Sequence, residues 1–144
     1  MFRVGIDIPA GEYAVFTSRD RSGYFGVFSD VNQNNIIYND NFDYNMFVTV
    51  VDGEYLKLSG CYAVSLAEND IRIDVSKGTM FRVGIDIPAG EYKLVADAGK
   101  DGYYAVYDNS RQDNIITNDI FGAQGYVTVS DGQNLILSRC HIDQ

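Results

Sequence analysis

The sequence is poor in several residue types on which common activities depend. It has no tryptophan, one histidine and two cysteines, and its 11 lysines and arginines are outnumbered by 20 aspartates and glutamates. The net charge of −9 repels phosphate groups, which argues against nucleic acid and anionic membrane surfaces as partners. No apolar run approaches the roughly 20 residues that span a bilayer, so we expect no membrane span. No signal peptide is recognisable, because Met1 leads directly into a strand-like pattern without a basic start.

The single histidine also limits the catalytic chemistry that the chain can carry. A Ser-His-Asp or Cys-His arrangement would have to use His141, next to Cys140 and replaced by Tyr62 in an earlier, similar stretch. Glycoside hydrolysis needs two carboxyl groups that face each other across a cleft, whereas Glu12 and Glu91 fall beside a turn. A zinc site lacks ligands, because His141 is the single histidine. We therefore expect no enzyme, no catalytic residue, no metal centre and no cofactor.

An internal repeat is the clearest positive feature. The stretch "MFRVGIDIPAGEY" stands at residues 1–13 and again, unchanged, at 80–92. Sliding the chain against itself aligns 1–65 with 80–144 without a gap, and about half of the aligned positions are identical. Two copies are too few for a solenoid, which favours a tandem pair. We expect a first repeat at 1–65, a connecting segment at 66–79 and a second repeat at 80–144.

Each copy has the pattern of short strands separated by turn residues. The stretches at 23–30 and 102–109 are rich in aromatic and β-branched residues, which are typical of strands. No segment sustains apolar residues at spacings of three and four for three turns, so we expect no helix. The pattern predicts an all-β fold with about five strands in each copy, built as two tandem small β-sandwich or barrel-like repeats.

The size of each copy predicts how the two are arranged. A domain of roughly 65 residues buries only a marginal core. We therefore expect the two repeats to pack on each other about a pseudo-twofold axis. In the connecting segment, "IRIDV" at 71–75 alternates apolar and polar residues, which predicts a strand.

Register arguments predict two hairpins in each copy. The first pairs Ile8 with Tyr13 across a Pro-Ala-Gly turn, and its core face carries Ile6, Ile8, Tyr13 and Val15. The second has a three-residue loop at 51–53, with Gly53 at positive φ. This loop length places four apolar residues on one face, namely Val48, Val50, Leu56 and Leu58.

Four motifs together carry a resemblance to a known kind of module. "VGIDIPAGEY", "GYY", "II-x-ND-x-F" and "VTV-x-DG-x-x-L-x-L", followed by a cysteine, occur in this order. The combination resembles a small all-β module of secreted proteins and lipoproteins of Gram-positive bacteria, which has no established activity. The resemblance covers both copies almost end to end, and it implies an extracellular or cell-envelope setting.

The resemblance also bears on the cysteines. Actinobacterial versions carry "GCYW" and "SGCGT", a pairing that looks like a disulfide. Here Cys61 and Cys140 match the second position, but Tyr24 and Tyr103 occupy the first, which removes the within-copy disulfide. Two buried free thiols are the favoured interpretation. A disulfide between Cys61 and Cys140 stays open, and it would need their Cα atoms within roughly 7 Å.

Asparagine and aspartate are concentrated in two loops, at 30–45 and 108–119. Their oxygens are ligands of the kind that Ca²⁺ prefers. The imaginable ligands are Asp30, Asn32, Asp40, Asp43, Asp108, Asp113 and Asp119. Their spacing matches no calcium loop, and these residues also stabilise turns by bonding their own backbone. The turn interpretation is favoured.

Aromatic residues on the strands at 23–30 and 102–109 are the candidate ligand-binding residues. Alternation places Tyr24 with Phe28, and Tyr103 with Tyr107, on one face of each strand. These rings either belong to the core or form an exposed platform for a ligand or partner. Sugars stack on such platforms, although tryptophan is usual there.

These patterns favour a non-catalytic tandem with a structural or adhesive role and a protein or glycan partner. The sequence leaves homo-oligomerisation open. One alternative is a carbohydrate-binding module that uses Tyr24, Phe28, Tyr103 and Tyr107. Another is a calcium-stabilised surface domain.

Overall fold

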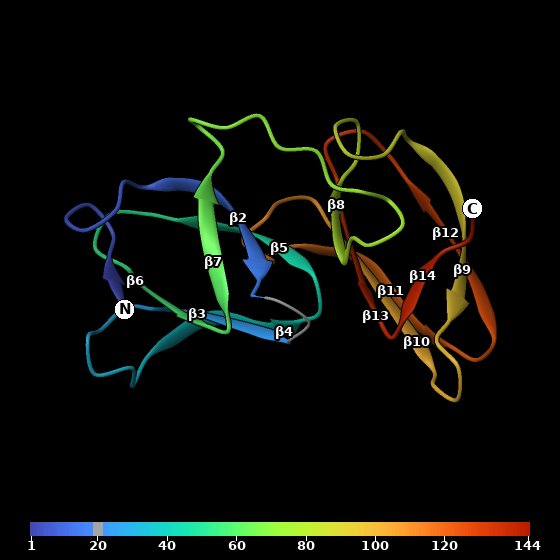
Figure 1. Ribbon diagram of the computed structural model, residues 1–144, viewed down its shortest axis with the longest axis horizontal. Coiled ribbons are helices and arrows are strands. Elements are labelled where there is room, and N and C mark those ends of the chain that lie inside the picture. Colours follow the sequence, from blue (N-terminus) through green and yellow to red (C-terminus); the bar gives the residue numbers. More distant parts are fainter. Residues whose placement is uncertain (19–21) are drawn as a thin grey trace. The chain divides into compact units, whose positions relative to one another are not determined.

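The computed structural model describes residues 1–18 and 22–144, and every regular element in this part of the chain is a β-strand (Figure 1). The prediction of an all-β fold is confirmed. The chain divides into two compact units, Met1–Ile71 and Arg72–Gln144, and each unit contains seven strands. The packing of the repeats on each other about a pseudo-twofold axis stays a prediction.

The first unit contains two antiparallel sheets. Its strands are β1 (Phe2–Arg3), β2 (Gly11–Thr17), β3 (Gly23–Phe28), β4 (Ile36–Phe42), β5 (Asn45–Val50), β6 (Tyr55–Ser59) and β7 (Cys61–Ser65). Four of them form a sheet in the order β1-β6-β3-β4, and three form a sheet in the order β5-β2-β7. β1 and β7 are therefore edge strands, one in each sheet.

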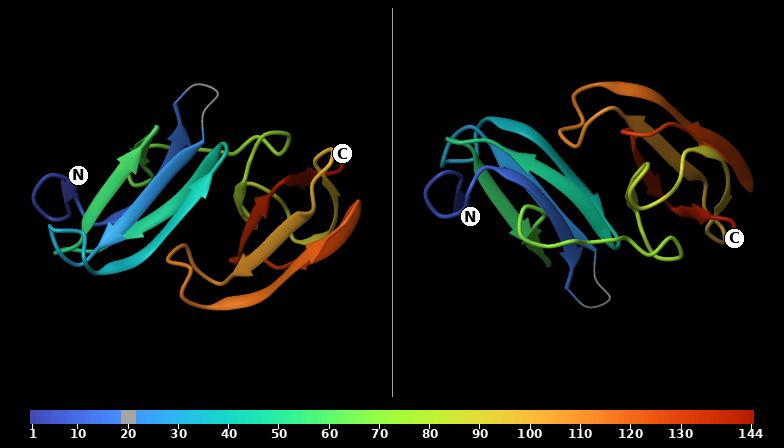
Figure 2. Two further views of the ribbon diagram at one scale, coloured as in Figure 1. Left: turned by 90° about the horizontal axis from the view of Figure 1, so that it is seen from below. Right: turned by 90° about the horizontal axis from the view of Figure 1, so that it is seen from above.

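The second unit repeats this arrangement strand for strand. Its strands are β8 (Met80–Arg82), β9 (Gly90–Ala96), β10 (Gly102–Tyr107), β11 (Ile115–Phe121), β12 (Gln124–Val129), β13 (Asn134–Ser138) and β14 (Cys140–Ile142). The sheet orders are β11-β10-β13-β8 and β12-β9-β14, so β8 and β14 are the equivalent edges. Within each unit the two sheets form two layers (Figure 2).

Apolar residues from both sheets form the core of each unit. In the first unit, Val15 and Val48 of the three-stranded sheet and Val27 and Leu56 of the four-stranded sheet are all buried. Burying such a side chain contributes about 1.5–3 kcal/mol. Tyr38 joins the layers: its hydroxyl donates to the carbonyl oxygen of Thr49 (2.6 Å) and accepts from the Thr49 N–H (3.1 Å).

The repeated stretch does not form the predicted hairpin. β1 pairs with β6, whereas β2 pairs with β5 and β7, so residues 4–10 cross from one sheet to the other. The crossing satisfies its own polar groups: the Arg3 N–H donates to Asp7 Oδ2 (2.8 Å), and the Tyr13 hydroxyl donates to the Pro9 carbonyl (2.7 Å). Ile6, predicted on the core face, is exposed because it sits at the tip of this turn, whereas Val15 is buried as predicted.

The glycine in this crossing explains part of the identity between the copies. Gly5 has a φ of 94°, and a Cβ added there would lie 2.9 Å from Asp52 Oδ1. Its counterpart Gly84 has a φ of 95° and lies equally close to Asp131. A side chain would be both strained and crowded. In each copy the "VGID" turn therefore requires glycine where it packs against the "DG" turn.

For the second hairpin, the predicted strand pairing is wrong, whereas the predicted turn is confirmed. β5 and β6 belong to different sheets. The turn between them is closed by the Glu54 N–H, which donates to the Val51 carbonyl (3.2 Å), and Gly53 has the predicted positive φ, 91°. Val48 and Leu56 do share a core, because the two sheets face each other rather than because the strands pair.

The connecting segment does not contain the predicted strand. No strand lies between β7 and β8, and a turn closed by bonds from Lys77 and Gly78 to the Asp74 carbonyl follows "IRID". The Ile73 N–H donates to the carboxylate of Asp86 (3.0 Å) instead of to a strand.

The number of strands in each repeat exceeds the predicted five because β1 and β7, with their counterparts β8 and β14, form separate edges.

Candidate functional site

The aromatic residues of β3 lie together but leave little open surface. β3 is an inner strand, between β6 and β4. Tyr24 and Phe28 flank Gly26: a Cβ added to this glycine would lie 2.8 Å from Tyr24 Oη and 2.7 Å from Phe28 Cε2. Phe28 is only 5% exposed, and Tyr24 is half-buried, with its hydroxyl accepting from Asn39 Nδ2 (3.2 Å).

The second repeat holds its aromatic pair in the same way. Tyr103 and Tyr107 on β10 are half-buried, and the residue between them on this face, Ala105, is buried. The Tyr103 hydroxyl accepts from Asn118 Nδ2 (3.2 Å). The structure thus brings together Tyr24 and Phe28 of the first repeat, and Tyr103 and Tyr107 belong to the separate second unit.

The two cysteines are free thiols held against the backbone of the aromatic strands. Cys61 Sγ donates to the Tyr24 carbonyl (3.3 Å), and Cys140 Sγ donates to the Tyr103 carbonyl (3.4 Å). Burial raises the pKa of both thiols, which lowers their thiolate fraction at neutral pH. His141 lies beside Asp97 (3.4 Å), and alternation along β14 directs its imidazole away from the Cys140 thiol.

Asp30 and Asp108 of the Asn/Asp-rich loops accept hydrogen bonds from within those loops. Asp30 accepts from the backbone N–H groups of Asn34 (3.1 Å) and Asn35 (2.9 Å), which is turn chemistry. Asp108 accepts from the side chain of Asn114 (2.5 Å). Among residues 1–18 and 22–144, no group of three or more His, Cys, Asp or Glu residues is placed to hold a metal ion.

Asp40 is the one carboxylate of these loops whose environment is unusual. Burial raises its pKa, and the hydrogen bond from the Asn41 N–H (2.9 Å) opposes this rise. Its counterpart in the second repeat, Asp119, is exposed. The same "ND" pair therefore has different surroundings in the two copies.

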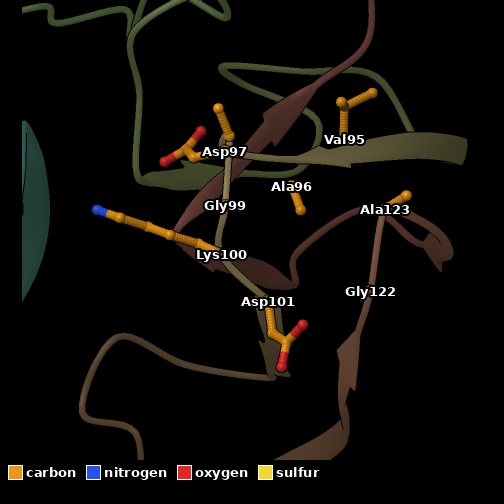
Figure 3. A pocket seen from close by; sticks show the side chains of 9 residues that line it. Val95, Ala96, Asp97, Gly99, Lys100, Asp101, Gly122 and Ala123 are labelled. Atoms are coloured by element: carbon orange, nitrogen blue, oxygen red, sulfur yellow. The ribbon is translucent and has the colours of Figure 1, made fainter.

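A hollow of about 490 Å³ lies in the second repeat, between the loop after β9 and the β11–β12 turn (Figure 3). Val95 and Ala123 line it, and they stand where the first repeat has Phe16 and Tyr44, whose ring centroids are 6.0 Å apart. The hollow is therefore the space that two rings fill in the first repeat. Its charged residues are exposed, and the Lys100 side chain extends away from Ala123.

A second hollow, of about 480 Å³, lies in the first repeat, and we call it the open groove. It runs along the side of the unit where the two sheets end in the edge strands β1 and β7. Its lining is mainly apolar and includes Met1, Phe2, Ile8, Leu58, Cys61 and Tyr62. This geometry suits an apolar segment that enters between the sheets.

The sequence did not predict the groove residues as a site. Phe2 has the same letter and the same neighbours as Phe81, yet Phe2 is 40% exposed and Phe81 is fully buried.

No family model, no curated protein and no solved structure matches this chain. The resemblance to the Gram-positive module therefore stays a prediction. The described residues contain no helix that is long and apolar enough to cross a membrane.

Proposed function

We propose that this chain is a non-catalytic binding module of the extracellular or cell-envelope space, and that the open groove of its first repeat holds a partner protein. The observation that carries this proposal is the groove itself, which is lined mainly by apolar residues and in which Tyr62 is 54% exposed. Contiguous exposed apolar surface on a folded domain commonly marks an interaction site. A structural or adhesive role follows from such a contact.

The form of the groove favours a polypeptide as the partner. Among the strands of the described residues, β1 pairs with β6 alone and β7 with β2 alone, so each presents one free edge to the groove. Edge strands accept extended peptides by adding a strand, and apolar pockets beside them select side chains. The lining includes no charged side chain, which suits apolar peptide side chains better than a charged or highly hydroxylated ligand.

The alternatives have less support. A carbohydrate-binding module would stack sugars on Tyr24, Phe28, Tyr103 and Tyr107, but Phe28 is only 5% exposed. A calcium-stabilised domain would use loop carboxylates such as Asp30, which already accept hydrogen bonds from their own loops.

Selection from a displayed random-peptide library tests the proposal. The full chain is the bait, and Tyr62→Glu is the variant that places a charge in the groove. Tyr126→Glu is the matched control, because Tyr126 of the second repeat is also 54% exposed. The selected peptides should bind the full chain and Tyr126→Glu equally, and bind Tyr62→Glu at least about tenfold more weakly. Failure to select any peptide, or selection of peptides that Tyr62→Glu does not affect, would contradict the proposal.

A further inference from the structure

The outer face of the three-stranded sheet, which points away from the core, differs between the repeats. In the first repeat, the ring of Phe16 contacts the rings of Tyr44 and Tyr62, at centroid distances of 6.0 and 5.8 Å. In the second repeat, Val95 stands in place of Phe16, and Ala123 stands in place of Tyr44. The second repeat therefore lacks two of the three rings of this cluster.

The backbone that carries these side chains is the same in both repeats. The Thr17 N–H donates to the Tyr44 carbonyl (3.0 Å), and the equivalent Ala96 N–H donates to the Ala123 carbonyl (3.0 Å). The strand pairings on both sides of β2 and β9 are also equivalent. The two repeats thus differ at this place in their side chains, and the hollow of about 490 Å³ lies where the second repeat has the smaller ones.

Small and apolar residues form one part of the lining of this hollow. Val95 projects from the outer face, because its neighbour Leu94 is fully buried in the core. Ala96 and Ala123 line the hollow as well, so no large side chain of its own fills it. This part of the lining suits an apolar ring.

The other part of the lining is charged and exposed. Asp97 and Asp101 carry carboxylates in the loop after β9, against the single ammonium group of Lys100. Figure 3 shows that the Lys100 side chain extends away from Ala123, which leaves the space beside this alanine open. A ligand in the hollow therefore has one apolar and one solvated end.

One aromatic ring of the cluster has a counterpart in the second repeat. His141 stands in place of Tyr62 and pairs with Val95 across β14 and β9, as Tyr62 pairs with Phe16. Its imidazole is 54% exposed and lies 3.4 Å from Asp97. Side chains of directly paired residues lie on the same face, so a ring beside Val95 would contact this imidazole.

We propose that the hollow of the second repeat binds the side chain of a tyrosine from a partner polypeptide. The ring occupies the space that Phe16 and Tyr44 fill in the first repeat. It contacts Val95 and Ala123 and lies beside His141. Tyrosine is favoured over phenylalanine because its hydroxyl suits the solvated, charged end of the hollow. This site goes beyond the proposed function, because it belongs to the other repeat and does not involve the open groove.

Charge indicates which residues flank this tyrosine. The loop of the hollow has two carboxylates, Asp97 and Asp101, and the whole chain has a net charge of −9. Both attract a partner that carries lysine or arginine beside the tyrosine. A second copy of this chain is a poorer source of the tyrosine, because it carries the same negative charge.

Titration of the ¹⁵N-labelled full chain with N-acetyl-tyrosinamide tests the inference. The amide resonances of Ala96, Ala123 and His141 should shift, while those of Thr17 and Tyr44 in the first repeat stay in place. N-acetyl-alaninamide lacks the ring and should shift none of them. Acetyl-Lys-Tyr-Lys-amide should bind more tightly than acetyl-Glu-Tyr-Glu-amide, because of the carboxylates beside the hollow.

The double variant Val95→Phe with Ala123→Tyr gives the second repeat the rings of the first. It should bind N-acetyl-tyrosinamide at least about tenfold more weakly, because its own rings fill the hollow and the ligand ring is no longer buried. Ala123→Tyr alone should also weaken binding, and Ala123 is exposed, so this variant keeps the fold. The matched control is Ile85→Tyr, which adds a ring in a turn of the same repeat where Ile85 is 49% exposed, and it should keep binding.

Five results would overturn the inference. They are unchanged resonances at millimolar N-acetyl-tyrosinamide, shifts confined to the first repeat, undiminished binding by Ala123→Tyr, tighter binding of the Glu-Tyr-Glu peptide, and self-association of the chain that Ala123→Tyr abolishes. The last result would assign the hollow to a second copy. Because Tyr62→Glu reports on the open groove and Ala123→Tyr reports on the hollow, failure of one proposal is distinguishable from failure of the other.

Discussion

Replacing Ile73 by alanine should destabilise the second repeat. Ile73 is 5% exposed, and its side chain fills the space beside Gly78 and the ring of Phe81. The substitution removes three carbons, each contributing about 0.8 kcal/mol when buried, and it leaves a cavity lined by the phenylalanine ring. Substitutions of buried isoleucine by alanine cost about 2–5 kcal/mol. We therefore expect a loss of about 3 kcal/mol in the free energy of unfolding.

Urea unfolding followed by far-UV circular dichroism measures this loss, and amide hydrogen exchange assigns it to a repeat. Ile85→Ala is the control, because Ile85 belongs to the same repeat and sits 49% exposed in a turn. It should cost less than about 1 kcal/mol. Equal losses of unfolding free energy for the two variants, or increased exchange confined to the first repeat, would refute the inference that Ile73 packs in the core of the second repeat.

Three further predictions follow from differences between the copies. Asp86→Ala should cost the second repeat about 3 kcal/mol in urea unfolding, because it removes a fully buried carboxylate that pairs with Arg82 and accepts the Ile73 N–H. Asp7→Ala should cost the first repeat much less, because the Asp7 carboxylate is partly exposed. Burial raises the pKa of Asp40, so its charged form destabilises the fold. Asp40→Asn should therefore raise Tm at pH 7, and this gain should vanish as the pH falls below 3.8, the usual pKa of aspartate. The control Asp119→Asn should not raise Tm. Gly84→Ala should cost about 1–3 kcal/mol in urea unfolding, because of its positive φ.

Each of these predictions has its own contradicting result. Equal losses of unfolding free energy for Asp7→Ala and Asp86→Ala would show that burial of the Arg82–Asp86 pair adds no stability. A Tm gain for Asp40→Asn that grows toward low pH would reverse the sign of the pKa shift. A neutral Gly84→Ala would mean that the turn relaxes to a φ that alanine tolerates.

The sequence predicted which side chains face the core better than it predicted which strands pair. Alternation correctly placed Val48 and Leu56 on one core, and the "DG" dipeptide correctly predicted positive φ at Gly53. Alternation determines the face of a strand, but it leaves the partner open. β2 pairs with β5 and β7, which are distant in sequence, so the predicted local hairpin of the repeated stretch was wrong.

The open groove could not be predicted for a different physical reason. Its phenylalanine and methionine stand in a stretch of 13 residues that is identical in both copies, and their burial depends on a neighbouring segment. The aromatic residues of the first copy, by contrast, were correctly grouped, since Tyr24 and Phe28 do lie on one face. Their role as a ligand platform stays a prediction.

The most direct test of the central claim is the binding of library-selected peptides to the full chain and to its two tyrosine variants. Tyr62 lines the open groove, whereas Tyr126 of the second repeat is equally exposed and is not among the groove residues. The account predicts that Tyr62→Glu weakens binding at least about tenfold and that Tyr126→Glu leaves it unchanged. Equal binding by all three proteins would contradict the claim that the open groove holds the partner.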